Sequence, residues 1–358
     1  MGLGHAGGPA SPALSYALAA THDGVVGHWT GAARFPAPPM GGSQAGDLGY
    51  LRGESRAHVR DAELAPLLAV KGLASGGAEL MFRGMPGPLV KIDRPAPSTF
   101  QAQLAWLRDY SDLRSERIGE INLQTGDLLS FFGAAAFLNA SRRKYTLELL
   151  HTILRQTVRL GYHFKHHCRA ARPIDLSDQV HPVIQTPDHS AFPSGHATES
   201  FAIATVLQML RHPGNPPGTG PLSFEPPTRN GNPIADFPGY GMLFRIAARI
   251  AVNRTIAGVH FPIDSMAGAM LGHSIGMAMA ALGTGRQIAA GPTPAPILGD
   301  TEDFTLPGLA ANLTAMALTF SEGPPPGDVS CFRELWRLAQ TEWPAPAPAD
   351  GPVGGRDQ

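Results

Sequence analysis

The chain has 358 residues, 43% of them apolar, which is enough to bury a sizeable core in one large domain or two small ones. Lys and Arg (28) nearly balance Asp and Glu (29), so the net charge of -1 gives no support to a nucleic-acid partner or a membrane surface. Any anion site must therefore be a local cluster of positive side chains.

The first 60 residues are rich in Gly, Ala and Pro with little periodicity, which predicts an irregular N-terminal arm over 1–60. They show no basic leader and no sustained apolar run, so we expect no secretory signal and a cytoplasmic protein, with export in the folded form left open. Two cysteines, Cys168 and Cys331, are too few for a disulfide framework. Both are expected to be buried free thiols.

From residue 61 to residue 343, apolar side chains recur at helical spacing, which predicts a single helical domain over 61–343. No run of alternating short strands is apparent. The predicted fold class is all-α, a bundle of about eight helices. The expected helices span 100–119, 122–139, 141–164, 195–211, 241–257, 262–283, 303–320 and 328–341.

Three other segments have distinct compositions. Residues 211–241 are rich in Pro and Gly and too long for a tight connection, which predicts a flap or rim beside a binding site. Residues 344–358 are predicted to be a disordered tail. Residues 265–283 are weakly polar, but His273 and many small side chains predict a closely packed core helix rather than a membrane span.

Three short stretches concentrate side chains suited to an oxyanion: "KHHCRAARP", "PSGH" and "NRTIAGVHFPID". Taken singly, each has a structural explanation, since a Lys near a helix end complements the dipole, Arg-Pro is a common helix exit and Ser before a helix is an N-cap. Together they supply three cations and a glycine N–H at a helix N-terminus, where anions bind readily. Their candidate site residues are Lys165, Arg172, Ser194, Gly195, His196, Arg254, His260 and Asp264.

The order Lys-x6-Arg-Pro, Pro-Ser-Gly-His, Arg-x5-His-x3-Asp resembles the three-part signature of the type 2 phosphatidic acid phosphatase and vanadium haloperoxidase superfamily, across residues 165–264. One departure is Asn253, where the family usually has Ser. The resemblance implies an enzyme with a helical bundle of the vanadium haloperoxidase or acid phosphatase type.

The resemblance also implies roles for the matching residues. His260 would be the nucleophile toward phosphorus or the axial ligand of vanadium, and Asp264 would fix its tautomer. His196 would be the general acid/base. The equatorial oxygens of vanadate, the implied cofactor, or of phosphate in the same site would be held by Lys165, Arg172, Ser194, Gly195 and Arg254.

His189 leads us to favour a vanadium-dependent haloperoxidase over an acid phosphatase. It lies seven residues before His196, as a second histidine does in vanadium bromoperoxidases, which implies hydrogen peroxide, a halide such as bromide and a small organic acceptor as partners. The alternatives are a loop histidine that caps the turn beside Asp188, a soluble acid phosphatase acting through a phosphohistidine, and an oxyanion-binding relic. No nucleic acid or membrane partner is expected, and a homo-oligomer is left open.

Overall fold

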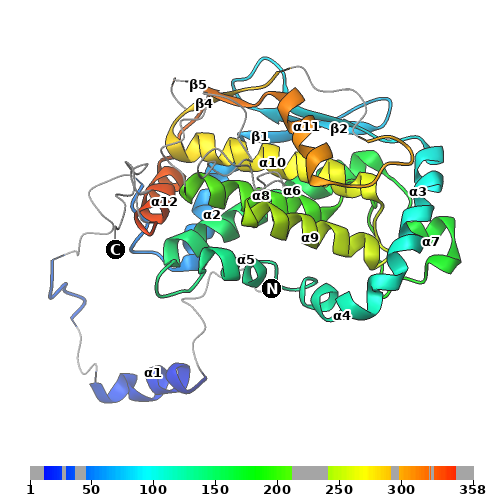
Figure 1. Cartoon of the computed structure of the whole chain (residues 1–358). Helices are drawn as coiled ribbons and strands as arrows, with labels where there is room; N and C mark the ends of the chain where they lie inside the picture. The colour runs from blue at the N-terminus through cyan, green and yellow to red at the C-terminus, as the bar shows by residue number, and fades with distance from the viewer. Residues whose placement is uncertain are drawn as a thin grey trace, which may run out of the picture. The chain divides into compact units, whose positions relative to one another are not determined.

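The computed structural model describes residues 12–25, 30–36, 46–211, 241–291, 298–321, 323 and 326–343 (Figure 1). Residues 212–240 of the predicted flap and the whole predicted tail, 344–358, lie outside them. The chain divides into two units, residues 1–41 and 42–358. The first contains helix α1 (Pro12–Val25), and the elements described below belong to the second.

The predicted all-α class is confirmed, because helices make up most of the described residues of the second unit. Their bounds are α2 (Gly53–Leu64), α3 (Pro97–Tyr110), α4 (Arg114–Leu123), α5 (Leu129–Ala136), α6 (Lys144–Cys168), α7 (Pro173–Leu176), α8 (Gly195–Arg211), α9 (Met242–Ile256), α10 (Pro262–Thr284), α11 (Leu306–Met316) and α12 (Ser330–Thr341), with 3-10 turns η1 (Ser111–Leu113) and η2 (Asp178–Val180).

Three parts of the predicted helix pattern were wrong. The expected helix 100–119 is divided by the 3-10 turn η1 into α3 and α4. The expected irregular arm contains α1, where Ala-rich sequence after Pro12 favours a helix, and most of α2, whose Leu64 is buried in the core. The expected helix 122–139 is broken between α4 and α5. Asp127 causes this break, because its Oδ1 accepts the backbone N–H of Ser130 (3.0 Å) and so caps the start of α5.

Five short strands were also not predicted. Strands β1 (Leu68–Gly72), β2 (Gly77–Phe82) and β3 (Pro88–Asp93) form an antiparallel sheet in the order β1-β2-β3, and β4 (Gln287–Ala289) pairs with β5 (Thr319–Ser321). The three-stranded sheet packs on α6 and α10, on the upper side of Figure 1. These strands are too short to give a clear alternating pattern in the sequence.

Helices α8 and α10 make the most extensive helix–helix contact of the fold. A Cβ at Gly268 would lie 2.5 Å from the carbonyl oxygen of Ser194, and one at Gly272 would lie 2.1 Å from that of Thr198, so glycine permits this close approach. Ser194 also donates its backbone N–H to the carbonyl of Asp264 (2.9 Å). The first turns of α8 and α10 therefore lie side by side.

The predicted core helix is α10, which is buried along nearly its whole length. Among the described residues it is the one helix with the length and apolar composition to cross a membrane, and its most apolar stretch is wholly buried inside the protein. Both cysteines are buried thiols outside any disulfide, as expected.

Helix α6 is anchored at its N-terminus by α12. Glu342, which follows α12, accepts the backbone N–H groups of Tyr145 and Thr146 (both 2.8 Å), which α6 itself cannot satisfy. A carboxylate at this end also complements the helix dipole. This contact fixes the helix that carries Lys165 at its other end.

Candidate active site

Five segments line one cavity of about 300 Å³. They are the turn after α4, residues 154–165 of α6, the loop before α8, the start of α8 and the loop between α9 and α10, which supplies His260. Of the sequence-predicted residues, the cavity wall includes Lys165, His189, Gly195, His196 and His260. The other four, Arg172, Ser194, Arg254 and Asp264, are buried, and each contacts a segment that forms the site.

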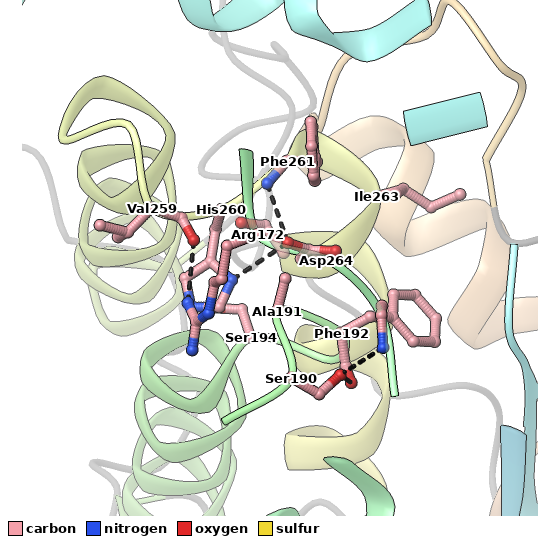
Figure 2. Close-up of polar contacts among 12 residues, drawn as sticks. Arg172, Ser190, Ala191, Phe192, Ser194, Val259, His260, Phe261, Ile263 and Asp264 are labelled. Carbon is pink, nitrogen blue, oxygen red and sulfur yellow. Dashed lines mark hydrogen bonds and ion pairs between the residues drawn. The ribbon is translucent and has the colours of Figure 1, made fainter. Parts of the chain in front are cut away.

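His260 is held between Arg172 and Asp264 (Figure 2). Pro262 begins α10 after extended Phe261, so Asp264 in the first turn faces back and its Oδ2 accepts both the Phe261 N–H (2.9 Å) and the Nδ1–H of His260 (3.1 Å). Burial and the neighbouring cations lower the pKa of His260 well below its usual value. The ring is therefore neutral, with its proton on Nδ1 and a lone pair on Nε2.

Burial has the opposite effect on the carboxyl beside it. Asp264 is fully buried and its pKa is raised, while the positive charges of Lys165 and Arg172 act to lower it. Its Oδ1 is buried with no hydrogen-bond partner among the described residues. Since Oδ2 accepts two N–H donors, the carboxyl is well suited to orient His260.

Arg172 uses its guanidinium to join the two loops of the site. It donates to the carbonyls of His189 and Val259 (both 2.9 Å), approaches Nε2 of His260 (3.3 Å) and contacts Nδ1 of His189 (3.0 Å). A guanidinium can only donate, so both of these ring nitrogens accept. Burial, followed by the charge of Lys165, lowers the pKa of His189, which favours its neutral form. Neutral His189 therefore carries its proton on Nε2.

Arg254 is a buried cation with unused hydrogen-bonding capacity. Its Nη2 donates to Oε1 of Gln124 (2.8 Å) and to the carbonyl of Ile121 (3.2 Å). Its Nε and Nη1 are buried without a partner among the described residues, and burial lowers its pKa to about 10. Because buried donors are almost always paired, two open guanidinium N–H groups indicate a place for an anion.

His196 lines the cavity from the first turn of α8. Its Nε2 lies 3.0 Å from the carbonyl oxygen of Gln124, which can only accept, so the proton is on Nε2 and Nδ1 is free to accept one. Burial and the charge of Arg254 lower the pKa of His196 to about 3. The ring is therefore neutral, and its Nδ1 can act as a base.

Three more predicted residues lie at the start of α8: Lys165, Ser194 and Gly195. Lys165 donates through Nζ to the carbonyls of Ser190 (2.8 Å) and Ala191 (3.4 Å), and burial lowers its pKa. The Ser194 hydroxyl accepts the N–H of Ala197 (3.4 Å), as an N-cap does, and keeps its own proton to donate. Gly195 lies on the cavity wall at the positive end of the helix.

Of the cavity residues that were not among the predicted site residues, three bear on the site: Gln124, Glu199 and Tyr162. Gln124 lies in the turn that interrupts the expected helix 122–139, and its Oε1 accepts from Arg254 and from Nδ2 of Asn253 (3.1 Å), which leaves its Nε2 buried and unpaired. Glu199 lines the cavity, and burial raises its pKa to about 7. The ring of Tyr162 packs edge to face against His189, with centroids 5.0 Å apart.

The geometry can bind a tetrahedral oxyanion and bring two neutral histidines to it. The PAP2 superfamily model matches residues 145–287, from the first turn of α6 to the first residue of β4, and so includes all three signature stretches.

Two individual proteins are similar to parts of the chain. A vanadium-dependent bromoperoxidase of Ascophyllum nodosum is 35% identical over 97 residues, which are 25% of this chain and 17% of that protein. A transmembrane PAP2-type phosphatidylglycerolphosphate phosphatase of Bacillus subtilis is 18% identical, with a TM-score of 0.34 over 50% of this chain and 83% of that structure. The match of one family model to all three signature stretches confirms the resemblance to the superfamily that the sequence predicted, over residues 145–287.

Proposed function

We propose that this protein is a vanadium-dependent haloperoxidase that oxidises a halide, bromide in the first instance, with hydrogen peroxide. The observation that carries the proposal is the position of His189. Its ring lies on the cavity wall with Nδ1 held by Arg172, so neutral His189 offers an Nε2–H as a donor beside the oxyanion site. A phosphatase needs no third histidine at this point.

The residues present fit vanadate. Vanadate would need a nitrogen ligand, which Nε2 of His260 can supply. The unpaired N–H groups of Arg254 could donate hydrogen bonds to the vanadate oxygens. Lys165, Arg172, Ser194 and Gly195 would share the remaining oxygens. When bound, vanadate would activate hydrogen peroxide for the two-electron oxidation of a halide.

The protein's own groups would then act as follows. Asp264 keeps the proton of His260 on Nδ1, so that Nε2 stays available. His196 would receive or return a proton through Nδ1, and His189 would donate a hydrogen bond from Nε2. Carbonyl contacts hold Lys165 and Arg172 in place before any anion arrives, which limits reorganisation on binding.

The alternative is a phosphatase that hydrolyses phosphomonoesters through a phosphohistidine at His260. One observation favours it. His260 and His196 lie in the same cavity as neutral imidazoles, one with an unprotonated Nε2 and one with an unprotonated Nδ1, the pair that nucleophilic attack and proton transfer need. The cytoplasmic location and the homo-oligomer stay predictions.

A direct assay separates the two functions. Purified protein would be tested with and without orthovanadate for peroxide-dependent bromination of a phenol-type dye and for hydrolysis of a generic phosphomonoester. We expect bromination that requires vanadate. If the vanadate-loaded protein shows no bromination and the protein hydrolyses the phosphomonoester, the haloperoxidase proposal is wrong and the phosphatase takes its place.

A further inference from the structure

The cavity has a polar inner end and an apolar outer wall. The inner end holds Lys165, His189, His196 and His260, whereas Leu128, Leu154, Val158 and Tyr162 lie along the wall. Its volume of about 300 Å³ is at the lower end of the usual range for small-molecule sites. A tetrahedral oxyanion would displace only a few water molecules of about 30 Å³ each, so most of this space remains for another group.

Three of the four apolar wall residues lie on one face of α6. Leu154, Val158 and Tyr162 are four residues apart in turn, which places them above one another over about 12 Å of helix. Val158 is 40% exposed and Tyr162 is 54% exposed, high values for large apolar side chains. Lys165 follows one turn later, so this stripe leads directly to the oxyanion end of the cavity.

Gly161 leaves room in the same wall. It lies inside α6 and lines the cavity, and a Cβ built on it would meet no atom within 4 Å. Its φ is not in the positive region, and no neighbouring backbone approaches it, in contrast to Gly268 and Gly272. Since glycine within a helix is destabilising relative to alanine, neither conformation nor packing explains it. Its effect here is to widen the cavity.

We propose that Leu128, Leu154, Val158 and Tyr162, with the space over Gly161, form an apolar subsite that binds a neutral aromatic ring of the substrate. The wall residues carry no charge, and the Tyr162 ring, packed against His189, offers an aromatic partner in a fixed orientation. The subsite rests on the proposed function, because the reacting group of the ligand has to lie at the oxyanion end.

Phosphonates test the subsite separately from the oxyanion site, because they present the same anion with different substituents and are not hydrolysed. Calorimetry on the wild-type protein would compare methylphosphonate, butylphosphonate and benzylphosphonate, each in competition with inorganic phosphate. We expect benzylphosphonate to bind at least tenfold more tightly than methylphosphonate, with butylphosphonate between them. Equal affinities for benzyl and butyl would overturn the aromatic assignment, and equal affinities for all three would overturn the subsite while the oxyanion site stands. Failure of all three to bind would overturn both.

Variants locate the effect on α6. Gly161→Leu fills the open space and should bring the benzyl-to-methyl affinity ratio close to one, with methylphosphonate binding unchanged. Val158→Thr keeps the shape of the wall but makes it polar, and should lower the ratio several-fold. The matched control is Gly119→Leu, the same change at an exposed position of α4 that also has no atom within 4 Å of its Cβ. A wild-type ratio in Gly161→Leu would contradict the proposal.

Discussion

Arg172 and His189 are joined through Nη2 and Nδ1, which lie 3.0 Å apart, and this contact sets the tautomer of a histidine that forms no hydrogen bond to a carboxylate of the described residues. The Nδ1 of His189 also lies 3.3 Å from the carbonyl of Ser190, but it cannot accept from Arg172 and donate to that carbonyl at once. The same guanidinium also contacts Nε2 of His260, so Arg172 and Asp264 together favour the tautomer of His260 with its proton on Nδ1.

His189→Ala tests the residue on which the choice of function rests. We expect peroxide-dependent bromide oxidation to fall far more than stability does, while vanadate still binds through His260 and the cations. Removal of a loop cap alone would cost about 1 kcal/mol of unfolding free energy and leave the chemistry intact. Bromination would be measured from pH 5 to 8 in vanadate-loaded wild type and variant. Equal activity in the two would reduce His189 to a turn residue.

Arg254→Ala should weaken the binding of phosphate and of vanadate at least tenfold. The side chain is buried with two open N–H groups, and the loss of a charged hydrogen bond of this kind costs about 1.5 to 3 kcal/mol. Calorimetry should also find that the two anions compete for one site. Arg249→Ala is the matched control on the same helix, because Arg249 is exposed and paired with Glu120. Independent sites for the two anions would contradict this prediction.

The two histidines of the reaction should separate in their effects. His260→Ala should abolish the bond between protein and oxyanion. His196→Ala should retain anion binding and lose turnover by roughly 10² to 10⁴, the usual contribution of a general acid or base. Binding and turnover would be measured on both variants, with His163→Ala, an exposed position of α6, as the control. Near-normal turnover in His196→Ala would remove its acid/base assignment.

Gln124→Ala should act on affinity rather than on proton transfer. The side chain holds Arg254 through Oε1 and presents an unpaired Nε2 toward the site, so its loss should raise KM or Kd by about tenfold, the value of one to two hydrogen bonds. His196 contacts the backbone carbonyl of Gln124, which alanine retains, so the pH profile of kcat should not move. A shifted profile with unchanged affinity would refute this division of roles.

Glu199→Gln should change how stability depends on pH. Burial raises the pKa of Glu199 to about 7 from its ordinary 4.5, so the neutral form is favoured in the folded protein. Its contribution to stability is therefore full below about pH 4.5 and is lost as the pH rises through 7. Glutamine does not titrate, so the Tm of the variant relative to wild type should increase between pH 5 and pH 8. A constant difference in Tm across this range would show that Glu199 ionises normally.

The sequence predicts those site residues whose side-chain type and spacing form the three motifs. Helical periodicity located the α6, α8, α9 and α10 segments, and the motif spacing selected residues that the fold brings to one cavity. Gln124 could not be found this way, because it contacts His196 through a backbone carbonyl that every residue possesses. The break at Asp127 was missed for a related reason, since its capping bond to Ser130 competes with a helical pattern that continues on both sides.

The junction of α8 and α10 has a consequence for how the protein opens. His196 and His260 lie next to the starts of these two helices. The starts are joined by the hydrogen bond from the Ser194 N–H to the Asp264 carbonyl, and Gly268 and Gly272 let the helices pack in direct contact. Local unfolding that frees the amides of this junction must also separate the two reactive rings. In hydrogen exchange, the amides of Ser194 and of Thr198, which donates to Ser194, should therefore exchange only with the slowest, near-global opening, so that loss of catalysis on warming coincides with cooperative unfolding.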